Sequence, residues 1–207
     1  MEDGKIIAVR DNGGSADIVV RIDNANLAAE IMDKQIKNVS LRLVDGRTLS
    51  PEQQKKIYAT LRDISQYTGY TPEETKEVMK YVHITRIGCD YFSLSDCSMS
   101  IARDFINTLT DFCLKHGVIL SERLSDRTDD IDTYLYQCIK HKKCAICGRL
   151  GEIHHWDAIG MGYDRRHYDD TENRKICLCR IHHTIAHQKG VRDFQQDYHV
   201  YGIVLKE

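Results

Sequence analysis

The alternation of apolar and polar residues predicts a β-hairpin at the start of the chain. Residues 5–9 and 17–22 are rich in apolar side chains, and Asp11-Asn12-Gly13-Gly14 between them is typical of a tight turn. Apolar residues recur with a helical spacing over 26–36, and they alternate with polar residues over 39–44. We therefore expect two paired strands, a short helix and a third strand in this region.

Two segments further on carry the complete signal for the start of a helix. Ser50-Pro51-x-Gln53 and Thr71-Pro72-x-Glu74 each combine a hydroxyl cap, a first-turn proline and a Gln or Glu that can bond back to the cap. The apolar spacing predicts that these helices end near Thr68 and Val82. Two more helices are expected: one at 99–116, with Ile101, Phe105, Leu109 and Phe112 near one face and Gly117 at its end, and one at 129–143, with Ile131, Leu135, Cys138 and Ile139 facing inward.

Length and composition predict an α+β protein of two domains. A chain of 207 residues with 42% hydrophobic content suffices for one ordinary core and a small additional module. We expect a mixed α/β domain with a hairpin and helices at 1–139 and a small metal-dependent domain at 140–207, without a flexible linker between them. An apolar run of 18 residues is missing, which argues against a membrane span, and so is a basic and apolar leader, which predicts a cytoplasmic protein.

Four residues near the C-terminus have the spacing of a structural zinc site. Cys144-x2-Cys147 is followed after 31 intervening residues by Cys179-x2-His182, so that three thiolates and one imidazole occur in two tight pairs. Gly148 permits the backbone to reverse after the first pair. Buried or redox-active thiols are the alternative, but a reducing cytoplasm favours metal binding by paired cysteines. Because a segment of about 60 residues buries little apolar surface, we expect zinc to stabilise its fold.

Four histidines in the same segment have the spacing of a second, catalytic metal site. His183 and His187 are four residues apart and share a face of a helix, so both can bind one ion. His154 and His155 are adjacent, and neighbouring side chains on a strand point to opposite faces, so that one binds the ion and the other does not. The spacing leaves open which of the two is the ligand. A neutral imidazole beside a metal ion is the arrangement with which a hydrolase takes a proton from water.

Residues 140–205 resemble the HNH endonucleases, a family with a ββα-metal fold, and in particular those encoded by bacteriophages and prophages. The segments that carry the resemblance are Cys144-x2-Cys147, His154-His155, Asn173, Cys179-x2-His182-His183 and His187, with Gly160-Met161-Gly162 and the run from Leu178 to His183. The resemblance implies that His154 is a metal ligand at the end of the first strand and that His155 is the general base, while His183 and His187 complete the metal site. It also implies hydrolysis to 5′-phosphate and 3′-hydroxyl ends with a magnesium, manganese, nickel or zinc ion, among which imidazole ligands do not distinguish.

The same resemblance assigns the central asparagine of the motif, which orients the general base, to Asn173. In the usual motif this residue lies nine positions before the helical metal histidine, whereas Asn173 lies ten positions before His183. A one-residue bulge would reconcile the spacing. Without a bulge, Arg174 occupies the central position and Asn173 is a turn residue.

Glycines and charge predict a DNA contact in the loop that precedes Asn173. Gly160-Met161-Gly162 lets the backbone approach a bulky polyanion, and Arg165 and Arg166 can bond to phosphate oxygens. The alternative is a solvated hairpin tip. The charge distribution favours DNA, because residues 140–192 contain 11 Lys and Arg against 6 Asp and Glu, whereas residues 1–139 contain 17 against 22.

The N-terminal two thirds resembles the NinB (Orf) family of phage recombination proteins. The resemblance rests on the run from Leu41-Arg-Leu to Leu49-Ser-Pro and on the helix that carries Leu61-Arg-Asp-Ile-Ser. It implies binding of single-stranded DNA and loading of recombinases by a dimer, and hence a recombinase or single-strand-binding protein and a second copy as partners. The alternative is a plain scaffold whose cysteines are ordinary buried groups, namely Cys89, Cys97, Cys113 and Cys138.

Two functions follow from these patterns. The first is a metal-dependent HNH DNA endonuclease of phage or prophage origin that acts in recombination or DNA processing, with a histidine base and one divalent ion. The second is a non-catalytic recombination mediator that binds single-stranded DNA and whose zinc module only docks it. Both functions predict DNA binding and zinc, and they differ in whether removal of the His155 side chain abolishes cleavage.

Overall fold

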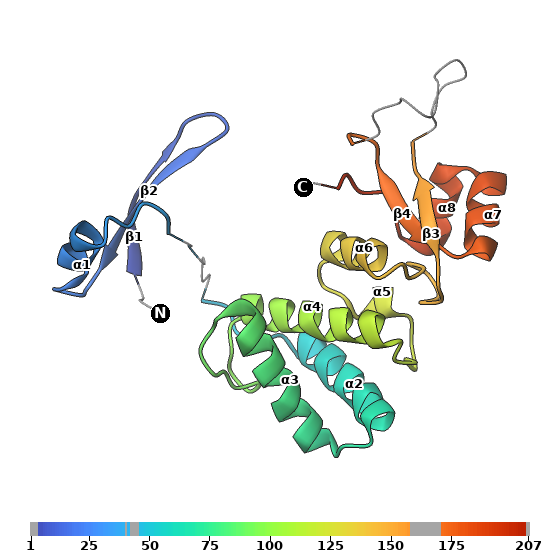
Figure 1. Cartoon of the computed structure of the whole chain (residues 1–207), viewed down its shortest axis with the longest axis horizontal. Helices are drawn as coiled ribbons and strands as arrows, with labels where there is room; N and C mark the ends of the chain where they lie inside the picture. The colour runs from blue at the N-terminus through green and yellow to red at the C-terminus, as the bar shows by residue number, and fades with distance from the viewer. Residues whose placement is uncertain (1–3, 40, 42–45, 158–170, 206–207) are drawn as a thin grey trace. The chain divides into compact units, whose positions relative to one another are not determined.

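The computed structural model describes residues 4–39, 41, 46–157 and 171–205 (Figure 1). These residues form eight helices and two antiparallel strand pairs, so the predicted α+β class is confirmed. In chain order the elements are β1 (Gly4–Asp11), β2 (Ala16–Ile22), α1 (Leu27–Asp33), α2 (Pro51–Thr68), α3 (Pro72–Ile87), α4 (Met99–His116), α5 (Leu124–Arg127), α6 (Ile131–Lys140), β3 (Glu152–His155), β4 (Lys175–Leu178), α7 (Arg180–Lys189) and α8 (Val191–Tyr198). Among the described residues, no helix has both the length and the apolar character that crossing a membrane requires.

Contacts within the chain divide it into two units, Met1–Val44 and Asp45–Glu207. The domain boundary predicted near Lys140 falls inside the second unit. Residues on both sides of Lys140 belong to one hydrophobic cluster, since Leu135 before it and Ile176 after it are both fully buried there. Independent folding of residues 140–207 therefore stays a prediction.

The first unit is a hairpin followed by a short helix. β1 pairs with β2 from Gly4 opposite Ile22 to Asp11 opposite Ala16, with one irregularity of register after Ile6. The predicted hairpin is confirmed, and α1 forms within the predicted range 26–36. The strand predicted at 39–44 lies mostly outside the described residues.

Three helices, α2, α3 and α4, open the second unit, and each begins with a hydroxyl cap. Ser50 Oγ accepts a hydrogen bond from the backbone N–H of Gln53, and Thr71 Oγ1 accepts one from that of Glu74. In both cases the Gln or Glu side chain bonds back to the cap, so both predicted capping boxes are present. Ser98 caps α4 in the same position, by accepting from the N–H of Ile101.

The ends of these helices agree with the sequence for α2 and α4 but not for α3. α2 ends at Thr68 and α4 at His116, as predicted, whereas α3 continues past the predicted end at Val82 to Ile87. Gly88 then takes a left-handed conformation with a φ of 73° and closes the helix. The glycine, rather than the fading apolar pattern, is thus the true stop signal.

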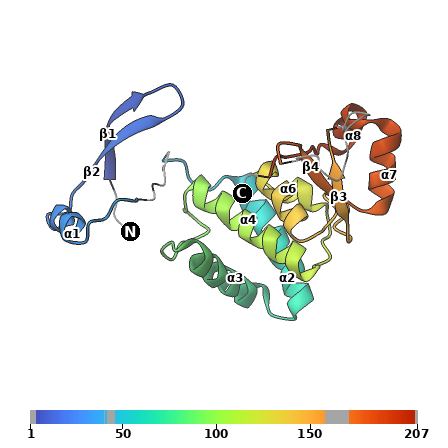
Figure 2. The same ribbon diagram turned by 45° about the horizontal axis from the view of Figure 1, so that its top comes forward.

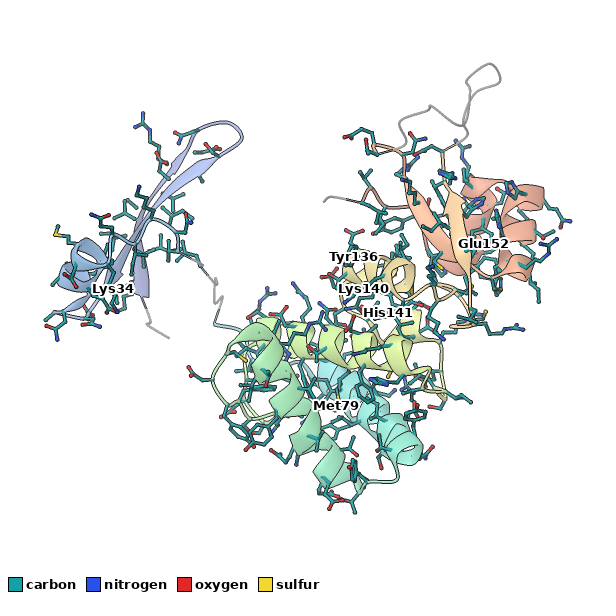
Figure 3. The ribbon with its side chains drawn as sticks, viewed as in Figure 1. Lys34, Met79, Tyr136, Lys140, His141 and Glu152 are labelled. Carbon is teal, nitrogen blue, oxygen red and sulfur yellow. The ribbon has the colours of Figure 1, made fainter. Side chains whose placement is uncertain are left out.

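The core between these helices is apolar and tightly covered. Ile57 of α2, Met79 of α3 and Phe105 of α4 are at most 1% exposed, and Met79 is labelled in Figure 3. The four cysteines that the scaffold interpretation assigned to the interior, Cys89, Cys97, Cys113 and Cys138, are all buried and form no disulfide. Their burial agrees with an ordinary packing role for these thiols.

A buried ion pair shapes the segment between α4 and α6, where α5 forms. One guanidinium nitrogen of Arg127 donates to Asp63 Oδ2 over 2.5 Å and another donates to Ser121 Oγ over 2.7 Å. Because the side chains of Arg127 and Asp63 are only 3% and 6% exposed, the pair ties this segment firmly to α2. The sequence pattern did not predict α5, since four residues are too few to show a helical period.

α6 connects the helical core to the C-terminal strand pair, and it lies between α4 and β4 in both ribbon views (Figures 1 and 2). It is shorter than the predicted 129–143, because Asp130 caps it by accepting from the N–H of Thr133. At its other end, His141 Nε2 lies 2.9 Å from Asp111 Oδ1 of α4 (Figure 3). The Tyr134 hydroxyl donates to the carbonyl of Ala145 over 2.6 Å. This bond fixes the turn that carries the first cysteine pair to the helical core.

Candidate metal centres and active site

The strand pair β3–β4 and the helix α7 bring the predicted ligands together. β3 and β4 are antiparallel, with His154 opposite Ile176 and His155 opposite Lys175. Since side chains alternate along a strand, His154 is 5% exposed whereas its neighbour His155 is exposed. α7 begins directly after β4, with Cys179 as its N-cap, so the order strand, strand, helix agrees with the predicted ββα arrangement.

The first ligand cluster, which we call the cysteine cluster, consists of Cys144, Cys147, Cys179 and His182. Cys147 Sγ lies 3.7 Å from Cys179 Sγ, and His182 Nδ1 lies 3.4 Å from Cys144 Sγ and 3.3 Å from Cys179 Sγ. With Zn–S bonds of about 2.3 Å, two sulfurs of a tetrahedral site are about 3.8 Å apart. The donor set and its spacing therefore fit zinc.

Local backbone structure explains the shape of the cysteine cluster. Gly148 follows the first pair with a φ of 67°, and its N–H donates to the carbonyl of Cys144 over 2.9 Å. A left-handed residue at this place favours glycine, as the sequence indicated. The N–H of Ala145 donates to the carbonyl of Cys177, so the turn is also bonded to β4.

The thiols of this cluster differ in their environment. Burial raises the pKa of Cys144 to about 12. Burial also opposes ionisation of Cys147, but hydrogen bonds from the backbone and side chain of Arg149 and from neighbouring sulfurs lower its pKa below the ordinary value. A buried thiol with a raised pKa becomes a thiolate only when a cation replaces its proton, so zinc binding at this cluster releases protons.

The second ligand cluster, which we call the histidine cluster, consists of His154, His183 and His187. The ring centroids are 4.6 to 4.9 Å apart, and Nε2 of His187 lies 3.1 Å from Nε2 of His183. Ring nitrogens of the three residues lie within 4.8 Å of one another, so they can bind one ion. Two of the three side chains come from successive turns of α7 and one from β3.

Burial makes His154 a neutral ligand. Burial, together with weaker charge repulsion from His183, His187 and His155, lowers the pKa of this imidazole to about 4. At neutral pH the ring therefore keeps a lone pair for a cation. The pKa of His182 in the cysteine cluster is lowered as well, first by burial and then by Arg149 and Arg123.

Glu152 is a functional candidate that the sequence interpretation missed. Its Oε1 lies 2.7 Å from His183 Nδ1, and it is labelled on β3 in Figure 3. A carboxylate that accepts from Nδ1–H selects the tautomer of His183 whose Nε2 can bind a metal ion. The available signal was the strand period, because Glu152 lies two residues before His154 and hence on the same face.

Asn173 and Arg174, the two candidates for the central position of the motif, lie just before β4. β3 and β4 pair in regular register over all four positions of Lys175–Leu178, so the bulge that would have corrected the spacing of Asn173 is absent from this pairing. Arg174 thus stands nine residues before His183, and its guanidinium bonds to both carboxylate oxygens of Asp157. This ion pair joins the residue that precedes β4 to the segment that follows β3. Asn173 lies in a bend just before Arg174.

The remaining predicted residues divide into two groups. His155 lies at the end of β3, next to the histidine cluster, and is not one of the residues of either ligand cluster found in the described part of the chain. Arg165 and Arg166, with Gly160-Met161-Gly162, lie outside the described residues. The DNA contact predicted for that loop therefore stays a prediction.

Comparison with known proteins was made at the level of families, curated proteins and solved structures. The family described as "Putative HNHc nuclease" matches residues 21–207, which is nearly the whole chain. Neither a curated protein nor a solved structure matches. The match includes both ligand clusters and the helices α2 to α6 that support them. It gives no indication of the NinB-like N-terminal region, which stays a prediction.

Proposed function

The chain belongs to the HNHc nuclease family, and from this premise we propose that it is a metal-dependent DNA endonuclease of phage or prophage origin, acting in recombination or DNA processing. The observation that carries the proposal is the convergence of His154, His183 and His187, with the exposed His155 next to His154 on β3. Metal-dependent hydrolysis of a phosphodiester uses a cation to stabilise developing charge and a base to activate water. These four histidines supply the groups for both.

In this proposal His154, His183 and His187 hold one divalent ion. The candidates are magnesium, manganese, nickel and zinc; imidazole ligands suit nickel and zinc best, and the choice among the four stays open. When bound, the ion neutralises negative charge that develops on the scissile phosphate and on the departing oxygen. Glu152 keeps His183 in the tautomer that binds, since it accepts a hydrogen bond from the other ring nitrogen.

His155 acts as the general base. Its ring takes a proton from a water molecule, whose oxygen attacks the phosphorus while the bond from phosphorus to the 3′ oxygen breaks. The products are a 5′-phosphate and a 3′-hydroxyl end, and the 3′ oxygen takes up a proton on leaving. An exposed imidazole suits this role, because water reaches it freely.

The cysteine cluster has a structural role in the proposal, with zinc as its ion. Its ligands join the turn at Cys144 and Cys147 to the start of α7, the helix that also presents His183 and His187. A zinc ion there holds α7 in place against β3 and so keeps the three catalytic ligands together. DNA is the proposed substrate because residues 140–192 carry an excess of basic residues, 11 against 6 acidic ones. A recombinase, a single-strand-binding protein and a second copy remain the proposed partners.

The experiment is a cleavage panel with purified protein. Supercoiled plasmid, single-stranded, junction and flap DNA are incubated with magnesium, manganese, nickel or zinc, and nicked and linear products are quantified. We expect His155→Ala to lower cleavage by a factor of about 10² to 10⁴ while zinc content and DNA affinity stay unchanged. His116→Ala, at an exposed histidine at the end of α4, is the matched control and should cleave like the unaltered protein.

The rival function is a non-catalytic mediator that binds single-stranded DNA. It predicts that the unaltered protein binds DNA but cleaves none of the four substrates with any of the four metals. It also predicts that His155→Ala changes nothing measurable. Either result would replace the nuclease proposal.

A further inference from the structure

A cavity of about 520 Å³ lies beside the cysteine cluster, away from the three catalytic histidines. Its walls are the end of α4, the segment between α4 and α5, one residue of α6 and the turn that carries Cys147. Small-ligand sites in proteins typically measure about 300–1,000 Å³. The cavity is therefore large enough for a ligand the size of a nucleotide.

Its lining is apolar where it is buried. Leu114, Val118, Leu124 and Ile146 are each at most 9% exposed and form the closed aliphatic floor of the cavity. Ile119 also lines the cavity but is 91% exposed, so a large apolar side chain is left in water at this place. An apolar ligand at the mouth of the cavity would cover the side chain of Ile119.

The exposed part of the lining is cationic. Arg123, Lys143 and Arg149 contribute three positive charges, against one carboxylate from Glu122. Arg149 interacts with the sulfur of Cys147, and Glu122 lies 3.4 Å from Arg127. Within the part of the chain that the structure describes, Arg123 and Lys143 form no ion pair with a carboxylate, so both remain available for an anion.

The walls of the cavity are firmly held. The buried pair of Arg127 and Asp63 ties the segment between α4 and α5 to α2, and Ser121 bonds to both members of the pair. The opposite wall is bonded to the core through Tyr134 and to β4 through Ala145. The site is thus built before any ligand arrives, which lowers the entropic cost of binding.

We propose that this cavity binds one unpaired nucleotide of the DNA substrate, with the base against the aliphatic lining and a phosphate between Arg123 and Lys143. This inference rests on the proposed nuclease function, which makes DNA the available anion. A base within a duplex is stacked and paired on both sides and cannot enter, whereas an unpaired base presents a free flat face. The substrate class that follows is DNA with a single-stranded segment near the cleavage site.

The test measures binding rather than cleavage, with calcium in place of the catalytic ion. Fluorescein-labelled single-stranded and duplex oligonucleotides of equal length are titrated with the full chain, and anisotropy is recorded at several salt concentrations. For Arg123→Ala/Lys143→Ala we expect at least a tenfold loss of single-strand affinity and a salt dependence lower by about one phosphate contact. Duplex affinity should change less than threefold. Lys55→Ala/Arg62→Ala, with the same charge change at exposed positions of α2, is the control.

A second variant tests the base contact. Ile119→Ser removes the exposed apolar side chain without opening the core, and it should weaken single-strand binding while melting as before. With an abasic single strand, the unaltered protein and Ile119→Ser should bind with the same affinity. Competition then separates the anion sources: a mononucleotide should displace the single strand at a lower concentration than inorganic phosphate.

Three outcomes would overturn the inference. Equal losses for single strand and duplex would make the cations a general charge contribution, and equal competition by phosphate would leave an anion site without a base contact. Unchanged single-strand affinity in both variants would exclude the cavity. Cleavage is scored in a separate assay, so a protein that binds through the cavity but cuts nothing refutes the proposed function and leaves this inference intact.

Discussion

The two ligand clusters share α7 but differ in nearly every physical respect. The cysteine cluster has four ligands in two tight pairs, and two of its thiols, those of Cys144 and Cys179, are buried. The histidine cluster has three ligands, of which one is buried and two are accessible to solvent. Four protein ligands complete a tetrahedral site, whereas three leave a coordination position for water or substrate.

α7 supplies ligands to both clusters, so one helix can contribute to the stability of the fold and to the proposed chemistry. His182 and His183 are adjacent and belong to different clusters, because consecutive residues of a helix point in directions about 100° apart. A zinc ion at His182, as proposed, would thereby set the position of His183. We expect changes in the cysteine cluster to alter stability first, and changes in the histidine cluster to alter cleavage alone.

The largest effect is expected for Cys144→Ser. Loss of a buried thiolate removes the structural ion, whose binding contributes on the order of 10 kcal/mol in small zinc modules, and residues 140–207 should lose their ordered structure. Elemental analysis after dialysis should show one zinc fewer per chain, and thermal unfolding should shift strongly downward. Cys177→Ala is the control, since Cys177 is equally buried but is not a ligand. Retained zinc with unchanged melting would refute the structural assignment.

His187→Ala should have the opposite effect, with little change in stability and a large loss of cleavage. The residue is exposed, so the free energy of unfolding should change by only about 0.5 kcal/mol, while the catalytic ion loses one of three protein ligands. We expect at least a hundredfold loss of plasmid nicking with the structural zinc retained, compared with His116→Ala. A melting temperature that falls as far as in Cys144→Ser would show that the two clusters are not separable.

A smaller effect is expected for Glu152→Gln, which sharpens the comparison within the histidine cluster. An amide holds the His183 ring less firmly than a carboxylate, and outer partners of metal ligands typically contribute a factor of about 10 to 100. Calorimetric titration with manganese or nickel should show weaker binding by this factor, with the zinc at the cysteine cluster unaffected. Glu172→Gln, an exposed carboxylate before β4, controls for the change in charge. Equal affinity in the two variants would exclude Glu152 as an orienting group.

The last prediction concerns the pH dependence of stability. The pKa of His154 is lowered to about 4 in the folded protein, while the unfolded chain binds a proton near the reference value of about 6.5. Between these two values the unfolded state holds one proton more, so the free energy of unfolding falls as the pH falls, by at most about 1.4 kcal/mol per pH unit. Urea unfolding at several pH values, with the structural zinc retained and the catalytic ion withheld, measures this slope. His154→Gln should flatten it, and an unchanged slope would contradict the origin in His154.

Much of the fold followed from local patterns in the sequence. The hairpin turn, the two capping boxes and the glycine after α4 each depend on a few neighbouring residues, and their structures agree with the predictions. α3 was predicted too short because the apolar pattern weakened before the helix ended at Gly88. α5 and α8 were not predicted, since both are short and are held by contacts with distant parts of the second unit.

The candidate ligands of both clusters could be chosen from the sequence alone, and the structure brings the same residues together. Two cysteines on one turn, or two histidines one helical turn apart, must lie close together in any fold that keeps the local backbone structure, so spacing suffices to predict them. Only the tertiary structure decided that Glu152 bonds to His183, that Arg174 pairs with Asp157, and that Arg123 and Lys143 line one cavity. These residues lie 17 to 31 positions apart in sequence, and their contacts depend on strand register and helix packing. Such long-range contacts arise from the burial of the whole core and leave no periodic signal in the chain.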